Sequence, residues 1–516
     1  MPFWMLPLKF KNGNLMTEKF KFYILFIFVF ICMLVPEAFS ASYGRTFAQA
    51  QTELRNFLSI SSANPYLPII ALIGFTMAIA TFYFPRFGLF IMLFFVMIST
   101  DMPLGGKDSV RQTTVRFEDV VLILVSIGWI LNKARTRSLS SIKENRLYKP
   151  ILAMSSIIII ATIFGFFQNT VQLHKGILYS MKRLEYFWIF FMTYNLMETR
   201  EDAWLSIKIF LWGSAAISII GIFQFTIFPL SSLAAGGSTA TAGFGRANTL
   251  ADFYLIILGV VMGLFIYCRD KKRLSIYAIL ILLFATAIIM TKSRGAYVSI
   301  PFIFLVIAYF SRNMKFIIVI VCLASIALIY QFGSIFITDQ TTKFLYDRQG
   351  EDIKNQVSSI GEVMKKGPSA DSSFNTRYVS WINAKPEIYK YPLLGHGVGS
   401  MPLYAFDNQY VAEVYDTGMI GLIAFLFLNV VIFLTVLHLY YITNDDFTKG
   451  LSLGYLGAQM GILVHGITIT NFYTIINMEA FWFILAIIML LFYLEKKDLH
   501  NISNSPSTPF SQESGG

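Results

Sequence analysis

The sequence is poor in the residues on which soluble and disulfide-linked proteins depend. Only 14% of its 516 residues are charged while 56% are hydrophobic, and no soluble core could hide so much apolar surface. The three cysteines, Cys32, Cys268 and Cys322, all lie in or beside apolar runs, which excludes a disulfide framework and a cysteine metal site. A Gly-rich phosphate loop is also missing, which argues against an ATP-driven pump. These absences indicate an integral membrane protein.

Long apolar runs occupy most of the chain. A helix needs about 20 apolar residues to cross a hydrocarbon core of about 30 Å, and backbone groups in lipid must be paired within the segment. We therefore predict an all-α polytopic membrane protein with about 12 to 14 transmembrane helices. The expected spans are 21–35, 66–83, 88–100, 117–131, 151–167, 184–197, 204–228, 250–268, 274–290, 298–310, 316–330, 419–441, 451–467 and 475–494.

The first apolar run has two interpretations. We expect a retained anchor, and the alternative is a cleaved signal peptide, because lysines precede the run and Ala38-Phe39-Ser40 resembles a cleavage site.

Basic residues set the predicted orientation, because cytoplasmic loops are enriched in Lys and Arg. With the N-terminus inside, the basic clusters at 133–149 and 269–273 both become cytoplasmic. This topology and attraction to anionic membrane lipid account for the net charge of +11, so nucleic acid is not an expected partner. The predicted parts are a cytoplasmic segment 1–20, transmembrane helices 1–11 over 21–330, a long extracytoplasmic loop 331–418 with short helices, transmembrane helices 12–14 over 419–494, and a disordered cytoplasmic tail 495–516.

Several basic residues fall on the outer side of this topology, where few are expected. Arg294 stands at the mouth of two abutting spans, Arg377 lies in the long outer loop, and Arg246 and Lys292 are on the same side. Snorkelling to lipid phosphates is one explanation for such residues. For the first two we favour an anionic partner, because a guanidinium is costly there without one and its planar fork suits phosphate. The pattern predicts a lipid substrate that carries phosphate.

Four stretches share an order and character with one known family. They are GFGRANTLADF at 243–253, TKSRGAY at 291–297, NTRYVSWINAKPEIYKYPLLGHGVGS at 375–400 and DNQYVAEVYDTGMIG at 407–421. Together they resemble the O-antigen ligase and polymerase superfamily of bacterial envelope glycan assembly, over roughly 117–494.

The resemblance implies an inverting glycosyltransferase that needs no metal or other cofactor and uses undecaprenyl-diphosphate-linked sugars as donors. Matched by position, Arg294 and Arg377 are implied to hold the donor diphosphate, with Arg246 and Lys292 as further cations beside it. Where the family has a histidine that activates the acceptor hydroxyl, this chain has Asp407. This departure puts the histidine mechanism in doubt, although a carboxylate also accepts protons.

The residues near Asp407 complete the predicted site. Asn408 is expected to orient Asp407 or the sugar, whereas the alternative is that this pair merely caps a short helix at 409–415. His396 is the rival base, because its flanking glycines allow close approach and its ordinary pKa of about 6.5 suits proton transfer. Tyr410 and Trp381 are candidate stacking platforms for a sugar.

These features favour a polymerase of lipid-linked O-antigen, capsule or exopolysaccharide repeats, because aspartate replaces the ligase histidine. The expected location is the bacterial inner membrane, with the site facing the periplasm or cell exterior. Two alternatives stay open: a ligase that passes the chain to a lipid-A core or other acceptor, and a non-enzymatic lipid-linked oligosaccharide flippase or transporter. Such transporters place their polar groups near the bilayer midplane. Lipid-linked glycan donor and acceptor and membrane lipid are the expected partners, and a chain-length regulator stays open as another.

Overall fold

The computed structural model describes the chain mainly at 117–136, 145–227, 247–313, 361–401 except 364, and 406–503, with short pieces between 83 and 115. The chain divides into two units, Met1–Met77 and Ala78–Gly516, and all that follows concerns the second. Several predictions fall outside the described residues: the spans at 21–35 and 316–330 and most of those at 66–83 and 88–100, the choice between anchor and signal peptide, Arg246, the loop from 331 to 360 and most of the tail.

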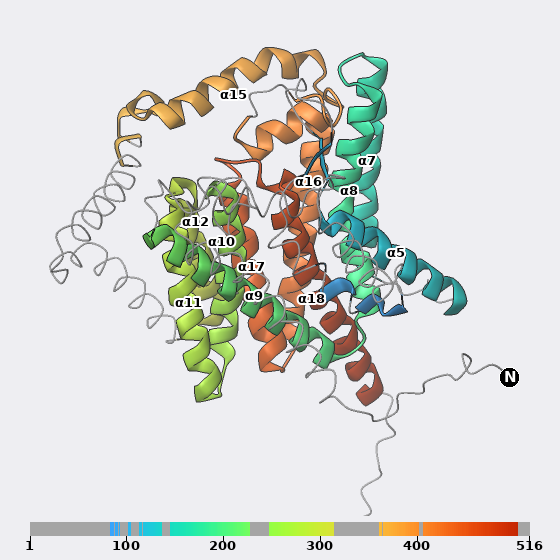
Figure 1. The fold of residues 1–516 in the computed structure, drawn as a ribbon, viewed down its shortest axis with the longest axis vertical. Helices are drawn as coiled ribbons and strands as arrows, with labels where there is room; N and C mark the ends of the chain where they lie inside the picture. The colour runs from blue at the N-terminus through green and yellow to red at the C-terminus, as the bar shows by residue number, and fades with distance from the viewer. Residues whose placement is uncertain are drawn as a thin grey trace, which may run out of the picture. The chain divides into compact units, whose positions relative to one another are not determined.

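Helices make up nearly all of the described secondary structure, which confirms the predicted all-α membrane fold. The exception is a pair of antiparallel three-residue strands that the sequence analysis did not anticipate. In chain order the elements are β1 Met102–Leu104, β2 Thr113–Val115, α5 Phe117–Thr136, α7 Tyr148–Phe167, α8 Leu173–Leu196, α9 Arg200–Ile227, α10 Ala247–Tyr267, α11 Lys271–Thr291, α12 Arg294–Ser311, η3 Pro368–Ala370, α15 Ser372–Lys390, α16 Gln409–Ile442, α17 Asp446–His465, η4 Asn471–Tyr473 and α18 Ile475–Ser503 (Figure 1).

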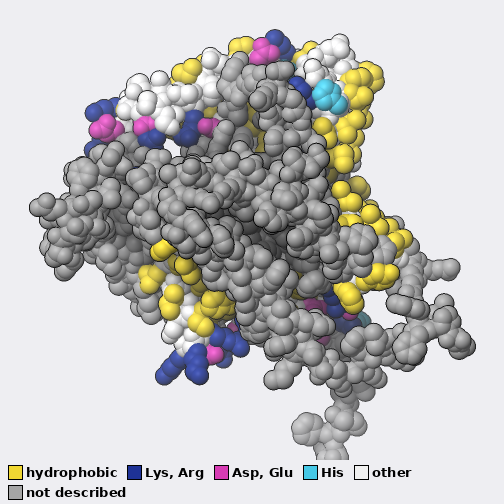
Figure 2. Space-filling model, viewed as in Figure 1, with side chains coloured by type: hydrophobic (Ala, Val, Ile, Leu, Met, Phe, Trp, Pro, Cys, Tyr) yellow, Lys and Arg dark blue, Asp and Glu magenta, His cyan; other side chains and the backbone are white. Residues whose placement is uncertain are grey.

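Seven helices in the described part of the chain, α7, α9, α10, α11, α12, α16 and α18, are long and apolar enough to cross a membrane. Large apolar side chains of α7 are exposed, among them Ile159, Ile163 and Phe167. Figure 2 shows apolar side chains along the side where α7 runs, and Lys and Arg side chains gathered where α11 begins. Lipid solvates such an apolar surface, so the chain is a multi-pass membrane protein.

The close approach of α10 and α17 fixes the centre of the helix assembly. Gly259 and Gly263 of α10 are spaced by four residues, as are Gly450 and Gly454 of α17. A Cβ at Gly263 would lie 2.2 Å from the carbonyl oxygen of Gly450, and one at Gly454 would lie 2.6 Å from that of Gly259. Small residues at this spacing let two helix backbones touch. Both helices carry polar side chains of the candidate site at one end.

α16 consists of two helical segments that meet at Gly418. This glycine has φ 70° and ψ −171°, a conformation that side chains disfavour. A Cβ there would also lie 2.1 Å from the carbonyl oxygen of Leu393. The first segment carries polar residues of the candidate site, and the second is the apolar run expected from residue 419 onwards.

The turn between Pro392 and Gly397 repairs the break in α16. A helix end leaves backbone N–H and C=O groups without intrahelical partners. This turn donates two N–H groups to the last carbonyls of the first segment and offers two carbonyls to the first N–H groups of the second. The bonds run from His396 to Tyr415 (2.8 Å), Gly397 to Asp416 (2.9 Å), Met419 to Pro392 (2.8 Å) and Ile420 to Leu393 (3.3 Å).

We expect Gly263→Val to destabilise the protein by about 1–3 kcal/mol or more, because the added side chain must push the backbones of α10 and α17 apart. The midpoint of thermal unfolding in detergent measures the effect. Gly361→Ala is the matched control, since a Cβ at Gly361 meets nothing within 4 Å. Equal midpoints for the two variants would contradict the proposed packing.

Candidate functional site

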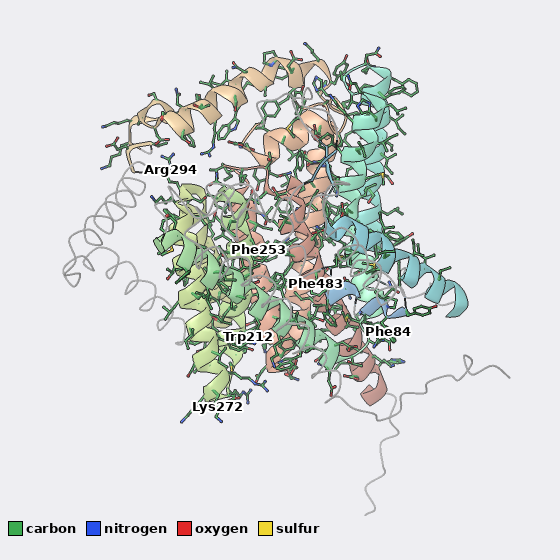
Figure 3. All side chains as sticks on the ribbon, viewed as in Figure 1. Phe84, Trp212, Phe253, Lys272, Arg294 and Phe483 are labelled. Atoms are coloured by element: carbon green, nitrogen blue, oxygen red, sulfur yellow. The ribbon has the colours of Figure 1, made fainter. Side chains whose placement is uncertain are left out.

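A polar pocket of about 180 Å³ lies where the ends of α10, α11, α12 and α15 meet. Figure 3 labels Arg294 at this end and Lys272 at the opposite end of the α11–α12 hairpin. The lining residues are Asn248, Lys292, Arg294, Gly295, Ser373, Arg377 and Thr468. Three of the four cations predicted from sequence therefore line one pocket, and the fourth, Arg246, precedes the described Asn248 by two positions.

A tight turn between α11 and α12 places two of these cations together. Only Lys292 and Ser293 separate the two helices, and Lys292 adopts the left-handed conformation with φ 54°. A non-glycine residue holds this conformation only where its surroundings favour it. The turn brings Lys292 and Arg294 to the same pocket.

Arg294 has the anionic partner that its position called for, and the partner is a carboxylate of the chain. Its Nη1 donates to Oδ2 of Asp371, which also caps α15 by accepting a hydrogen bond from the Phe374 N–H at 2.8 Å. Burial opposes ionisation of Asp371, yet the hydrogen bonds from Arg294 and from the backbone leave the pKa of this carboxyl below its usual value. Sequence reasoning missed Asp371, although an Asp before a helix start is a recognised cap signal.

Asp407 lies beside the second arginine. Its Oδ2 accepts a hydrogen bond from Nε of Arg377 at 3.4 Å, and both side chains remain partly exposed. Arg377 lines the pocket, so Asp407 contacts a residue of the pocket wall. This contact links two motif stretches that are 30 positions apart in the chain.

The neighbouring Asn408 acts as a helix cap. Its Oδ1 accepts hydrogen bonds from the N–H groups of Tyr410 (2.9 Å) and Val411 (3.1 Å) at the start of α16. The structure thus divides the Asp-Asn pair, since Asn408 caps the helix whereas Asp407 pairs with an arginine. Capping was the alternative role predicted for both residues, and of the two Asn408 caps the helix.

The two candidate stacking residues lie in packed surroundings. Tyr410 donates its hydroxyl to the carbonyl of Leu463 at 2.7 Å, and its ring meets Phe425 edge-on. Trp381 of α15 packs against a buried cluster that includes Met401 and Phe406. Tyr410 therefore contacts α17 and the second segment of α16, whereas Trp381 packs against the buried cluster next to α15.

His396 is buried in the turn that repairs α16. Its side chain is only 5% exposed, and its ring stacks on Tyr415 with centroids 4.3 Å apart. Burial lowers the pKa of His396 below its ordinary value. Its backbone carbonyl accepts a hydrogen bond from Thr170 at 2.5 Å and lies where Gly165 of α7 passes closely. These contacts make His396 a part of the scaffold.

A buried ion pair anchors the first segment of α16, and sequence reasoning missed it. Arg183 of α8 donates to Glu413 at 2.7 Å, and the two side chains are 7% and 1% exposed. The same carboxylate accepts hydrogen bonds from Tyr473 (3.1 Å) and Thr417 (2.8 Å), while the guanidinium lies over the Tyr473 ring. The available signal was an arginine and a glutamate within helical stretches of a membrane protein, where charges require partners.

A second buried chain of polar groups joins α10, α17 and the cation turn. Nδ1 of His465 lies 2.6 Å from Oδ1 of Asp252, and Nε2 lies 3.3 Å from the hydroxyl of Ser293. The sequence analysis did not include this chain in the predicted site. An aspartate within the apolar run of α10 was the signal for it.

The site therefore combines a cationic pocket with a carboxylate at its edge. Three fixed cations suit an anion with more than one negative charge, and arginines bind such groups through paired hydrogen bonds. A carboxylate beside them is able to take up a proton from a hydroxyl group.

We expect Arg183→Met to lower the stability of the protein by about 3–5 kcal/mol, because Glu413 would be left buried without its cation. The double variant Arg183→Met/Glu413→Gln removes the unpaired charge while retaining the shape of the side chain, and should regain most of this loss. Thermal unfolding in detergent compares the three proteins. A double variant that is no more stable than Arg183→Met would contradict the pairing.

Part of the chain matches a known family. Residues 278–426 match the family model described as O-antigen ligase. No curated protein matches the chain. The matched region runs from α11 into the second segment of α16, so it contains Lys292, Arg294, Arg377 and Asp407. The match confirms the predicted resemblance to the O-antigen ligase and polymerase superfamily over these residues.

Proposed function

We propose that this protein polymerises lipid-linked glycan repeats by metal-independent, inverting glycosyl transfer from an undecaprenyl-diphosphate donor. The single observation that carries the proposal is the convergence of Lys292, Arg294 and Arg377 on one pocket with Asp407 joined to Arg377. The reaction would take place at the outer face of the bacterial inner membrane, where the predicted topology puts these residues.

The pocket fits the leaving group of this reaction. A diphosphate carries several negative charges, and its departure from the sugar adds charge to the bridging oxygen. Fixed cations that are already in place stabilise such charge without reorganisation. Lys292 and Arg294 enter the pocket from the α11–α12 turn and Arg377 enters from α15, so the diphosphate would be held from two sides.

The proposed step forms one bond and breaks one bond. The acceptor hydroxyl oxygen bonds to the anomeric carbon as the bond from that carbon to the diphosphate oxygen breaks, and the electron pair leaves with the diphosphate. The hydroxyl proton passes to Asp407. When the diphosphate binds Arg377, it competes for the guanidinium that holds Asp407, and the carboxylate then becomes available as a base.

We assign the base to Asp407 and not to His396. Asp407 stands next to a residue that lines the pocket and is partly exposed, whereas the imidazole of His396 is buried against Tyr415. Asn408 would contribute by fixing the start of α16 and hence the position of Asp407.

Ligation of a finished chain and lipid transport are the alternatives, and one experiment separates all three. Membrane vesicles that contain the purified protein receive a lipid-linked repeat, with or without a lipid-A core acceptor. A polymerase lengthens the glycan without the core, a ligase forms a product only with it, and a flippase moves lipid without forming a glycosidic bond. The absence of new glycosidic bonds under both conditions would refute the proposal.

We expect Asp407→Asn to reduce turnover by about 10²–10⁴-fold while donor binding is retained, because the amide keeps the size of the side chain but cannot accept the proton. Glycan length on gels and the rate of repeat addition in vesicles provide the measurements. Glu362→Gln is the matched control, because it neutralises an exposed carboxylate outside the pocket. Long chains made by Asp407→Asn at normal rates would leave Asp407 as only the partner of Arg377.

We expect Arg294→Gln and Arg377→Gln each to weaken donor binding by about 10-fold or more, since each removes a charge-assisted contact to phosphate. Arg377→Lys should restore little, because a lysine cannot make the forked contact. Inhibition by inorganic pyrophosphate reports on the pocket directly. Lys390→Gln, on the exposed surface of the same helix as Arg377, is the control. Unchanged inhibition in the arginine variants would place the diphosphate elsewhere.

A further inference from the structure

The chain formed by Asp252, His465 and Ser293 has the connectivity of an acid, an imidazole and a hydroxyl in series. All three residues are at most 2% exposed. Nδ1 of His465 lies 2.6 Å from Oδ1 of Asp252 and Nε2 lies 3.3 Å from the Ser293 hydroxyl, so the tautomer that directs Nδ1–H at the carboxylate leaves Nε2 to accept from the hydroxyl. The three residues come from α10, α17 and the turn before α12, so the series joins three helices.

This series ends at the turn that presents two pocket cations. Ser293 lies between Lys292 and Arg294, and its N–H donates to Thr291 at 3.3 Å. The imidazole also packs against the pocket wall, because a Cβ on Gly295 would lie 2.6 Å from Cδ2 of His465. A movement of the His465 ring would therefore shift this turn.

The other end of the series is fixed by Asp252 and Asn471. Oδ1 of Asp252 accepts from His465 and from Nδ2 of Asn471 (3.1 Å), whose amide also donates to the carbonyl of Ile462 at 2.6 Å. The other oxygen of Asp252, Oδ2, is buried and has no hydrogen-bond partner among the described residues. A buried carboxylate with only one oxygen hydrogen-bonded lowers the stability of the protein. Its presence in an apolar helix therefore requires a functional explanation.

We propose that Asp252 and His465 are positioning residues that act through Ser293 to hold Lys292 and Arg294 in the geometry that binds the donor diphosphate. The inference rests on the proposed function of the pocket. A nucleophilic role for Ser293 fits less well, because its hydroxyl is buried and it occupies the position before the first turn of α12. A carboxylate that orients an imidazole, which in turn orients a third group, is an arrangement known to fix geometry in enzyme sites.

Two conservative variants separate positioning from a merely structural role. In His465→Asn, the side-chain amide can still donate to Asp252, but it is too short to meet Ser293. Ser293→Ala removes the hydroxyl alone. If the series positions the cation turn, both variants should bind pyrophosphate about 10- to 100-fold more weakly, since misplacement by ~1 Å is worth on that order. In turnover assays the KM for the lipid-linked donor should rise while kcat changes little.

The binding experiment uses the full-length protein in detergent, with inorganic pyrophosphate as the probe in calorimetry. Gln459→Met is the matched control, because it removes another buried hydrogen bond on α17, to the carbonyl of Asn429, away from the pocket. Thermal unfolding accompanies each variant, so that loss of binding is compared among folded proteins.

The outcomes distinguish the inference from the function on which it rests. Weakened binding in Ser293→Ala and His465→Asn, with Gln459→Met like wild type, is the expected result. If Arg294→Gln loses binding while Ser293→Ala and His465→Asn bind like wild type, the positioning role is wrong and the pocket assignment stands. If Arg294→Gln also binds like wild type, both are wrong.

Discussion

The pairing of charges across distant parts of the chain is the interaction on which this end of the molecule depends. A charged side chain near lipid is expensive unless an opposite charge or a hydrogen-bond partner meets it. Arg183 meets Glu413, and Arg294 meets Asp371. The first contact joins α8 to the first segment of α16, and the second joins α12 to Asp371 at the start of α15, so both hold parts of the segment from α15 to the first half of α16. The requirement to satisfy charge therefore also decides where that segment docks.

The break in α16 gives the docked segment a rigid base. Without the break, the polar first turns of α16 would continue along the axis of its apolar part and would not turn towards the pocket. The helix kinks at Gly418, and four backbone groups beside the break find partners in the turn from Pro392 to Gly397. Arg183 then holds the redirected segment through Glu413. Asp407 lies just before this segment, so its position is fixed as well.

Much of the fold and part of the site could be predicted from the sequence. Hydropathy located the helices because lipid forces backbone pairing within each segment, and motif order brought Arg294 and Arg377 together. The contacts of Asp371, Glu413 and His465 could not be predicted, because each depends on which faces of non-adjacent helices meet. The capping role of Asn408 was weighed but not separated from Asp407, since both residue types cap helices equally well.

Three cations in one pocket would repel one another in the absence of an anion, and the structure offsets this with carboxylates at the edge. Asp371 neutralises Arg294, and Asp407 neutralises Arg377. In the proposed reaction these carboxylates are exchanged for the donor diphosphate, so binding of the donor releases Asp407 beside the place where charge develops. The carboxylate is held by an arginine until the donor arrives, and the arginine is then occupied by phosphate when the proton must move.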